Sequence, residues 1–133
     1  MRTFVDTSAF LGLIDADEMR HADVRRAWVD LLERKAPLLT TNYVLVETHA
    51  LIQRRLGLDA LRCWLDDMLP VVRVHWVDET EHLAAATALL AAGKRRLSLV
   101  DCVSFEVMRV RGIRRALTLD RHFSEQGFLC LPG

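Results

Sequence analysis

The sequence predicts an α/β fold with a mostly parallel central sheet of four to five strands and helices on both faces. Short runs of β-branched and other apolar residues recur along the chain, and segments with apolar residues at helical spacing separate them. This alternation is typical of parallel strands joined by helices that cover the sheet. With 133 residues, the chain is predicted to be one domain, residues 1–133.

The first third of the chain is predicted to form two strands with two helices between them. Residues 2–5 favour a strand, and residues 9–14 are apolar almost throughout, which suits a short buried helix. Residues 20–35 carry apolar side chains at helical spacing, and Pro37 ends that helix. The second strand is then expected at residues 38–41.

The middle of the chain is predicted to contain two helices and a third strand. Asn42 is the expected N-cap of an amphipathic helix over residues 43–56. Residues 58–69 form another expected helix, which ends before Pro70. The β-branched run at residues 71–77 predicts the third strand.

The last part of the chain repeats the alternation of helix and strand. Asp78 or Thr80 is expected to cap an alanine-rich helix. A further helix, which Asp101 opens, is expected to continue to about residue 111. Strands are then expected at residues 116–119 and 128–131.

Composition and charge limit the possible functions without choosing among them. The chain is 51% hydrophobic and 27% charged, as in soluble globular proteins. Acidic and basic residues both number 18, which leaves nucleic acid open as a partner because local patches decide that. Basic residues cluster at Arg54–Arg55, Lys94–Arg96 and Arg114–Arg115.

Three cysteines, Cys63, Cys102 and Cys130, lack the spacing of a disulfide framework or a zinc site, which indicates a reducing compartment. No signal peptide and no membrane span are recognised. A cytoplasmic location and no membrane partner are therefore expected.

Four carboxylates fall at matching places in this layout. Asp6 ends the first strand and Asp120 the fourth, Glu47 lies early in the helix after the second strand, and Asp101 opens a later helix. In open α/β sheets ligands bind outside the carboxyl ends of the strands. We therefore expect the four side chains to lie along one edge of the sheet.

Each acid also has a purely structural explanation. Ser98 and Asp101 fit a capping box, Asp6 and Asp120 fit helix caps, and Glu47 fits an exposed helix position. Taken together, however, the acids have apolar neighbours, and buried acids are rarely left unpaired. Several close carboxylates repel one another, and a hard cation such as Mg²⁺ or Mn²⁺ removes that conflict. The chemistry predicted is metal-assisted hydrolysis of a phosphodiester.

Four motifs, taken in order along essentially the whole chain, resemble those of the PIN-domain nucleases, and most closely the VapC-type toxins of prokaryotic toxin–antitoxin pairs. Each motif is short, but the ordered set is specific. The motifs are Phe4–Ala9, Thr41–Glu47, Leu97–Asp101 and Leu117–Phe123.

The resemblance implies a metal-dependent endoribonuclease that cuts single-stranded RNA, uses Mg²⁺ or Mn²⁺, and needs no nucleotide cofactor. It also implies a cognate antitoxin protein as partner and a homodimer. Asp6 and Asp101 are expected to bind the metal directly, and Glu47 and Asp120 directly or through water. Ser8 and Thr118 match hydroxyl residues expected to hold these carboxylates in place.

Other polar residues near these motifs have two interpretations each. Arg95, Arg96 and Arg121 are the best candidates for contacts with RNA phosphates. Arg54, Arg114 and Arg115 are weaker ones. His122 follows Asp120 and is either a general base or simply a surface residue at a helix start.

Two alternative functions fit the same pattern less well. A catalytically silent PIN-like module that binds RNA or protein would not need a full set of acids. A phosphoacceptor receiver domain would need adjacent acids after the first strand and a lysine after a late strand. Asp6 instead lies between Val5 and Thr7, and no lysine follows Lys94.

Overall fold

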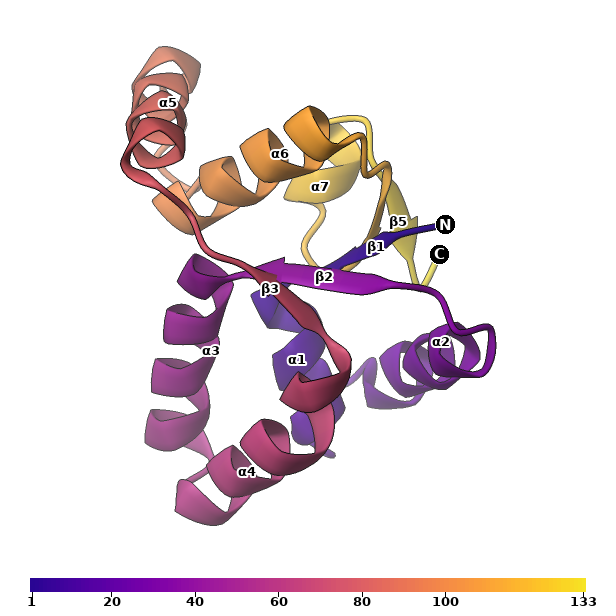
Figure 1. Ribbon diagram of the computed structural model, residues 1–133. Coiled ribbons are helices and arrows are strands. Elements are labelled where there is room, and N and C mark those ends of the chain that lie inside the picture. The colour runs from indigo at the N-terminus through magenta and orange to yellow at the C-terminus, as the bar shows by residue number, and fades with distance from the viewer.

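The computed structural model describes residues 1–133 and contains one five-stranded sheet (Figure 1). All neighbouring strands are parallel, in the order β3-β2-β1-β4-β5. The predicted fold class is therefore confirmed. The strands are β1 Thr3–Val5, β2 Leu38–Thr41, β3 Arg73–His75, β4 Arg115–Leu117 and β5 Leu129–Leu131.

Helices cover both faces of the sheet. In Figure 1, α1 to α4 lie on one side, and α6 and α7 lie on the other, where α5 packs on α6. No helix combines the length and the apolar character that crossing a membrane requires. The helices are α1 Thr7–Ile14, α2 His21–Glu33, α3 Asn42–Arg55, α4 Leu58–Cys63, α5 Glu79–Ala92, α6 Leu99–Arg111 and α7 His122–Glu125.

The central strand β1 is fully buried, with aromatic side chains packed on both of its faces. On one side Phe10 of α1 meets Trp64 edge-on, with ring centroids 5.5 Å apart. On the other, Phe123 of α7 lies 4.9 Å from Phe105 of α6 and 6.3 Å from Phe4 of β1. Burial of such rings contributes a large part of the hydrophobic stabilisation. The strand that carries Asp6 is thus held rigidly from both faces.

Two strands depart most from the sequence prediction. Strand β3 spans Arg73–His75 instead of residues 71–77, because Val71 still belongs to a 3-10 turn, η2 Leu69–Val71. Strand β4 ends at Leu117, so the prediction that Asp120 ends this strand is wrong. Thr118 N still donates to Leu131 O of β5, but the N–H groups of Leu119 and Asp120 bond to side-chain hydroxyls, and this turns the chain out of the sheet.

Two helix boundaries also differ from expectation. Thr41, and not Asn42, is the N-cap of α3: its hydroxyl accepts from Val44 N at 3.2 Å. Asn42 Oδ1 instead accepts from Val77 N at 2.7 Å and so ties the helix to the next connection. The helix expected at residues 58–69 breaks after Cys63 into a π-turn, η1 Trp64–Met68, followed by η2. The Pro70 ring lacks an N–H to continue an α-helix there.

Candidate metal centre

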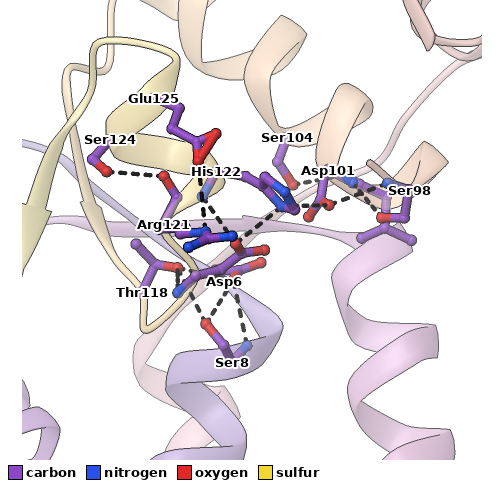
Figure 2. A network of polar contacts seen from close by, with 12 residues as sticks. Asp6, Ser8, Ser98, Asp101, Ser104, Thr118, Arg121, His122, Ser124 and Glu125 are labelled. Carbon is purple, nitrogen blue, oxygen red and sulfur yellow. Dashed lines mark hydrogen bonds and ion pairs between the residues drawn. The ribbon is translucent and has the colours of Figure 1, made fainter. Parts of the chain in front are cut away.

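Strand register brings Asp6 to the same edge of the sheet as the end of β4. Val5 pairs with Leu117, and Asp6 N donates to Leu117 O at 3.1 Å. Asp6 and Thr118 therefore leave the sheet side by side. We call this region, with Asp6, Asp101 and Asp120, the carboxyl edge (Figure 2).

Two hydroxyl groups hold the Asp6 carboxylate. Ser8 Oγ donates to Asp6 Oδ2 at 2.8 Å, and Thr118 Oγ1 donates to the same oxygen at 3.0 Å. Ser8 N also donates to Oδ2, at 3.4 Å, so Asp6 is at once the N-cap of α1. The positive end of the helix dipole stabilises an anion at that position. Capping and the fixed orientation of the carboxylate thus come from the same contacts.

The same hydroxyls direct the chain after β4. Ser8 Oγ accepts from Leu119 N at 2.8 Å, and Thr118 Oγ1 accepts from Asp120 N at 2.9 Å. These bonds satisfy backbone donors that leave the ladder. They bring Asp120 back towards Asp6, even though it lies three residues beyond the end of β4.

Asp101 comes to the carboxyl edge on the first turn of α6. It forms the predicted capping box with Ser98: Asp101 N donates to Ser98 Oγ at 3.0 Å, and Ser98 N donates to Asp101 Oδ2 at 3.2 Å. The residue is 9% exposed. The box fixes the carboxylate at a helix N-terminus, where an anion is favoured.

His122 joins two of these acids. Its Nδ1 lies 3.1 Å from Asp120 Oδ1 and 3.9 Å from Asp101 Oδ2, and Figure 2 shows the ring directed at Asp101. Ligand atoms of Asp101, Asp120 and His122 all lie within 4.8 Å of one another. Asp6 and Glu47 are not part of that tight group.

The carboxyl edge has an excess of negative charge. None of Asp6, Asp101 and Asp120 forms an ion pair with lysine or arginine; the neighbouring Arg121 pairs with Glu125 instead, at 3.7 Å. Carboxylate oxygens without basic partners are the ligands that a hard divalent cation takes.

Burial and mutual repulsion act on these acids. Burial raises the pKa of Asp6 from 3.8 to about 6, and the charges of Asp101 and Asp120 add to the rise against the opposing Ser8 and Thr118 hydrogen bonds. Burial also raises the pKa of Asp101, with a further contribution from Asp120 and an opposing one from Ser98. A cation bound here would reverse both penalties.

The other predicted site residues form no hydrogen bond or ion pair with the acids of the carboxyl edge. Glu47 is half-buried in the second turn of α3, and its side chain forms no hydrogen bond or ion pair. Arg95, Arg96 and Arg121 are exposed, and their contacts with RNA stay a prediction. His122 is the residue that sequence reasoning undervalued. The sequence feature that points to His122 is its position two residues after Asp120. In the structure, Asp120 Oδ1 accepts from His122 N at 2.9 Å, which keeps the imidazole ring close to the acids.

The fold and this group of acids define a recognisable class of protein. A model of the PIN domain family matches residues 3–129, and the chain belongs to that family. The predicted family resemblance is thereby confirmed.

Relatives extend the comparison to particular proteins. The chain is 38% identical over 128 residues to the 23S rRNA-specific endonuclease VapC20 of Mycobacterium tuberculosis, covering 95% of each chain. A crystal structure of VapC20, described as a Sarcin-Ricin loop cleaving toxin, matches with a TM-score of 0.85 over 96% of both chains.

Two more distant solved structures share the fold. VapBC2 from Rickettsia felis, bound to a DNA fragment from its promoter, has a TM-score of 0.71 at 13% identity and covers 98% of this chain and 97% of its own. FitAcB from Neisseria gonorrhoeae has a TM-score of 0.68 at 15% identity and covers 98% and 96%. At this identity the likeness concerns the fold alone.

Proposed function

We propose that this chain is an endoribonuclease that hydrolyses RNA phosphodiester bonds with Mg²⁺ or Mn²⁺, and that it acts as the toxin of a toxin–antitoxin pair. The observation that carries the proposal is the set of three carboxylates, Asp6, Asp101 and Asp120, gathered at the carboxyl edge without a lysine or arginine counter-charge. The named activity of the 38% identical relative supports the same class of reaction.

The donor set fits a divalent cation. Asp101 and Asp120 offer oxygen ligands near the His122 imidazole, and Asp6 adds a buried carboxylate whose charged form a cation would stabilise. We assign Asp6 and Asp101 as direct ligands, and Asp120 and Glu47 as ligands that act directly or through water. A bound cation supplies a more acidic water and offsets charge that develops on the phosphate.

The chain's own groups orient this chemistry. Ser8 and Thr118 fix the Asp6 carboxylate, and Ser98 fixes Asp101. His122 N donates to Asp120 Oδ1 at 2.9 Å, and this bond holds the Asp120 carboxylate in place. Such supporting contacts keep ligand oxygens in place before substrate binds, which is how metal sites gain affinity.

RNA and protein partners follow from the same proposal. Exposed Arg95, Arg96 and Arg121 would bind RNA phosphates, and the VapC20 relative makes 23S rRNA the first substrate to test. A cognate antitoxin would hold the toxin inactive in the cytoplasm.

A homodimer is the proposed assembly. Helix α5 carries apolar residues on all sides but packs on α6 along only one, which leaves Leu83 and Leu90 at 56% and 83% exposure. A helix that is apolar all round is normally covered. Exposed apolar area of this kind is typical of an interface.

The test is cleavage of purified ribosomal RNA by purified protein. We expect cleavage with Mg²⁺ or Mn²⁺, none in excess EDTA, and recovery when Mn²⁺ is added back. Cleavage that continues in EDTA would contradict the metal assignment. Protein that binds Mn²⁺ but cuts no RNA under any of these conditions would favour a silent binding module.

A further inference from the structure

A basic hollow lies at the end of the sheet opposite to the carboxyl edge. It has a volume of about 660 Å³ and is lined by Arg2, Arg73 and Arg111 together with prolines and aliphatic residues. Arg2 precedes β1, Arg73 begins β3, and Arg111 ends α6. We call this region, where the parallel strands begin, the amino edge.

The three arginines of the amino edge lack acidic partners. No aspartate or glutamate lines the hollow, and none of the three guanidinium groups is in an ion pair. Two of them are nevertheless held in place. Arg2 Nη2 donates to Arg111 O, and Arg111 Nη2 lies 2.8 Å from His75 Nδ1. Arg73 has no side-chain partner and is exposed.

The outer surface of α2 gives a useful contrast. That helix is also rich in arginine, but acids lie among its arginines and two pairs form: Arg26 with Asp23 at 3.7 Å, and the C-cap Arg34 with Asp30 at 3.1 Å. Exposed pairs of this kind contribute little to stability, but they cancel the local field. At the amino edge no arginine is paired in this way; Glu81 pairs with His75, the residue that Arg111 contacts, at 2.8 Å.

We propose that the amino edge is a second binding site for the phosphate backbone of RNA, separate from the site of cleavage. The inference rests on the proposed ribonuclease function. Arginine forks bind phosphate oxygens in pairs, and unpaired arginines around a hollow attract a polyanion. The exposed apolar lining, formed by Pro37, Pro70 and Val71, offers contact to a ribose or the face of a base.

The residues that line the hollow favour RNA over a protein partner. Protein interfaces need a central apolar area, but Val71, at 48%, is the only exposed large hydrophobic residue that lines it. Asp6 lies four residues beyond Arg2 on β1, or about 13 Å at strand spacing. Because β1 is buried, RNA must take a longer path over the surface and needs at least about four stacked nucleotides. The site would therefore contact a different segment of the RNA than the one being cut.

Binding can be measured without cleavage. An Asp6→Asn background is titrated with a ribosomal RNA stem–loop of about 30 nucleotides across a salt series. Adding Arg2→Gln and Arg73→Gln should weaken binding about tenfold and lower the slope of log K against log salt by about 2. Arg26→Gln together with Arg34→Gln, two exposed arginines paired with Asp23 and Asp30, is the matched charge control and should change affinity less than twofold.

Hydroxyl-radical footprinting locates the contact. The Asp6→Asn protein with its arginines intact should protect two RNA segments, one at the site of cleavage and one at the amino edge. Adding Arg2→Gln and Arg73→Gln should remove protection of the second segment only. Affinity loss no larger than in the control variant, or an unchanged footprint, would overturn the proposal. Thermal unfolding verifies that the variants fold. Because the background does not cut, this result is independent of whether the wild-type protein cleaves RNA.

Discussion

The two edges of the same parallel sheet carry opposite, uncompensated charge. At the carboxyl edge Asp6, Asp101 and Asp120 lie together without a lysine or arginine partner. At the amino edge Arg2, Arg73 and Arg111 line a hollow without an acid. Charges of one sign destabilise the folded chain unless something external binds them. The difference between the edges therefore indicates two kinds of partner: a cation at one edge, and a polyanion at the other.

The edges also differ in burial. Asp6 is 3% exposed and held by two hydroxyls, so its carboxylate cannot turn to water when it lacks a cation. The arginines of the amino edge are exposed and remain hydrated. Removing a charge should consequently have large effects at the carboxyl edge and small ones at the amino edge.

The largest effect is expected from neutralising a carboxyl-edge acid. Asp101→Asn and Asp6→Asn each remove a proposed metal ligand and should lower the rate of RNA cleavage by about a thousandfold or more. The rate is measured on ribosomal RNA at saturating Mn²⁺. Asp66→Asn, on the exposed part of η1, is the control and should retain wild-type activity. A loss of less than tenfold at either site would show that the acid is not essential.

The next largest effect concerns stability. Because the pKa of Asp6 is raised to about 6 in the fold, the folded chain takes up this proton at higher pH than the unfolded chain. Without metal, Asp6→Asn should therefore be more stable than wild type at neutral pH, by about 1 to 3 kcal/mol. The advantage should shrink as pH falls through about 6 towards 4. Denaturant unfolding in EDTA measures it, and equal stability at neutral pH would contradict the buried-charge account.

A smaller effect is expected when a supporting hydroxyl is removed. Thr118→Val keeps the side-chain shape but loses the bond to Asp6 Oδ2 and the acceptor for Asp120 N. Mn²⁺ affinity should fall about tenfold. Thr87→Val on α5, whose hydroxyl bonds only to Leu83 O, is the matched control. An unchanged Mn²⁺ affinity in Thr118→Val would mean that the hydroxyl does not position the site.

The smallest effect separates the two edges. Arg73→Gln removes an exposed charge at the opposite end of the sheet from the carboxylates, farther than the Debye length of about 8 Å beyond which salt screens most of the interaction. Its Mn²⁺ affinity, measured calorimetrically, should stay within twofold of wild type. A larger change would mean that the two edges are electrostatically coupled and that the comparison between them fails.

The sequence predicted most of the fold because its signals are local. Alternating strand and helix patterns gave the parallel sheet, and Ser98 and Asp101 gave their capping box through spacing alone. The predicted end of β4 was wrong because Leu119 N donates to Ser8 Oγ, and a longer strand would need that N–H. Ser8 lies more than a hundred residues away in sequence. No local pattern contains that contact.

The candidate site was predictable only where its residues have local sequence signals. Acids next to strand ends and helix starts are visible in a sequence, whereas the His122 ring position depends on a fold-back around Asp120. The arginines of the amino edge are far apart in sequence and are not the clustered ones that composition singled out. Only the strand register and the course of α6 bring them together.

The central claim is that the carboxyl edge holds a divalent cation. Calorimetric titration of Mn²⁺ into wild type, Asp6→Asn, Asp101→Asn and the Asp66→Asn control tests it most directly. The account predicts saturable binding to wild type and control, and affinity at least tenfold weaker in both site variants. Equal Mn²⁺ affinity in all four proteins would contradict it.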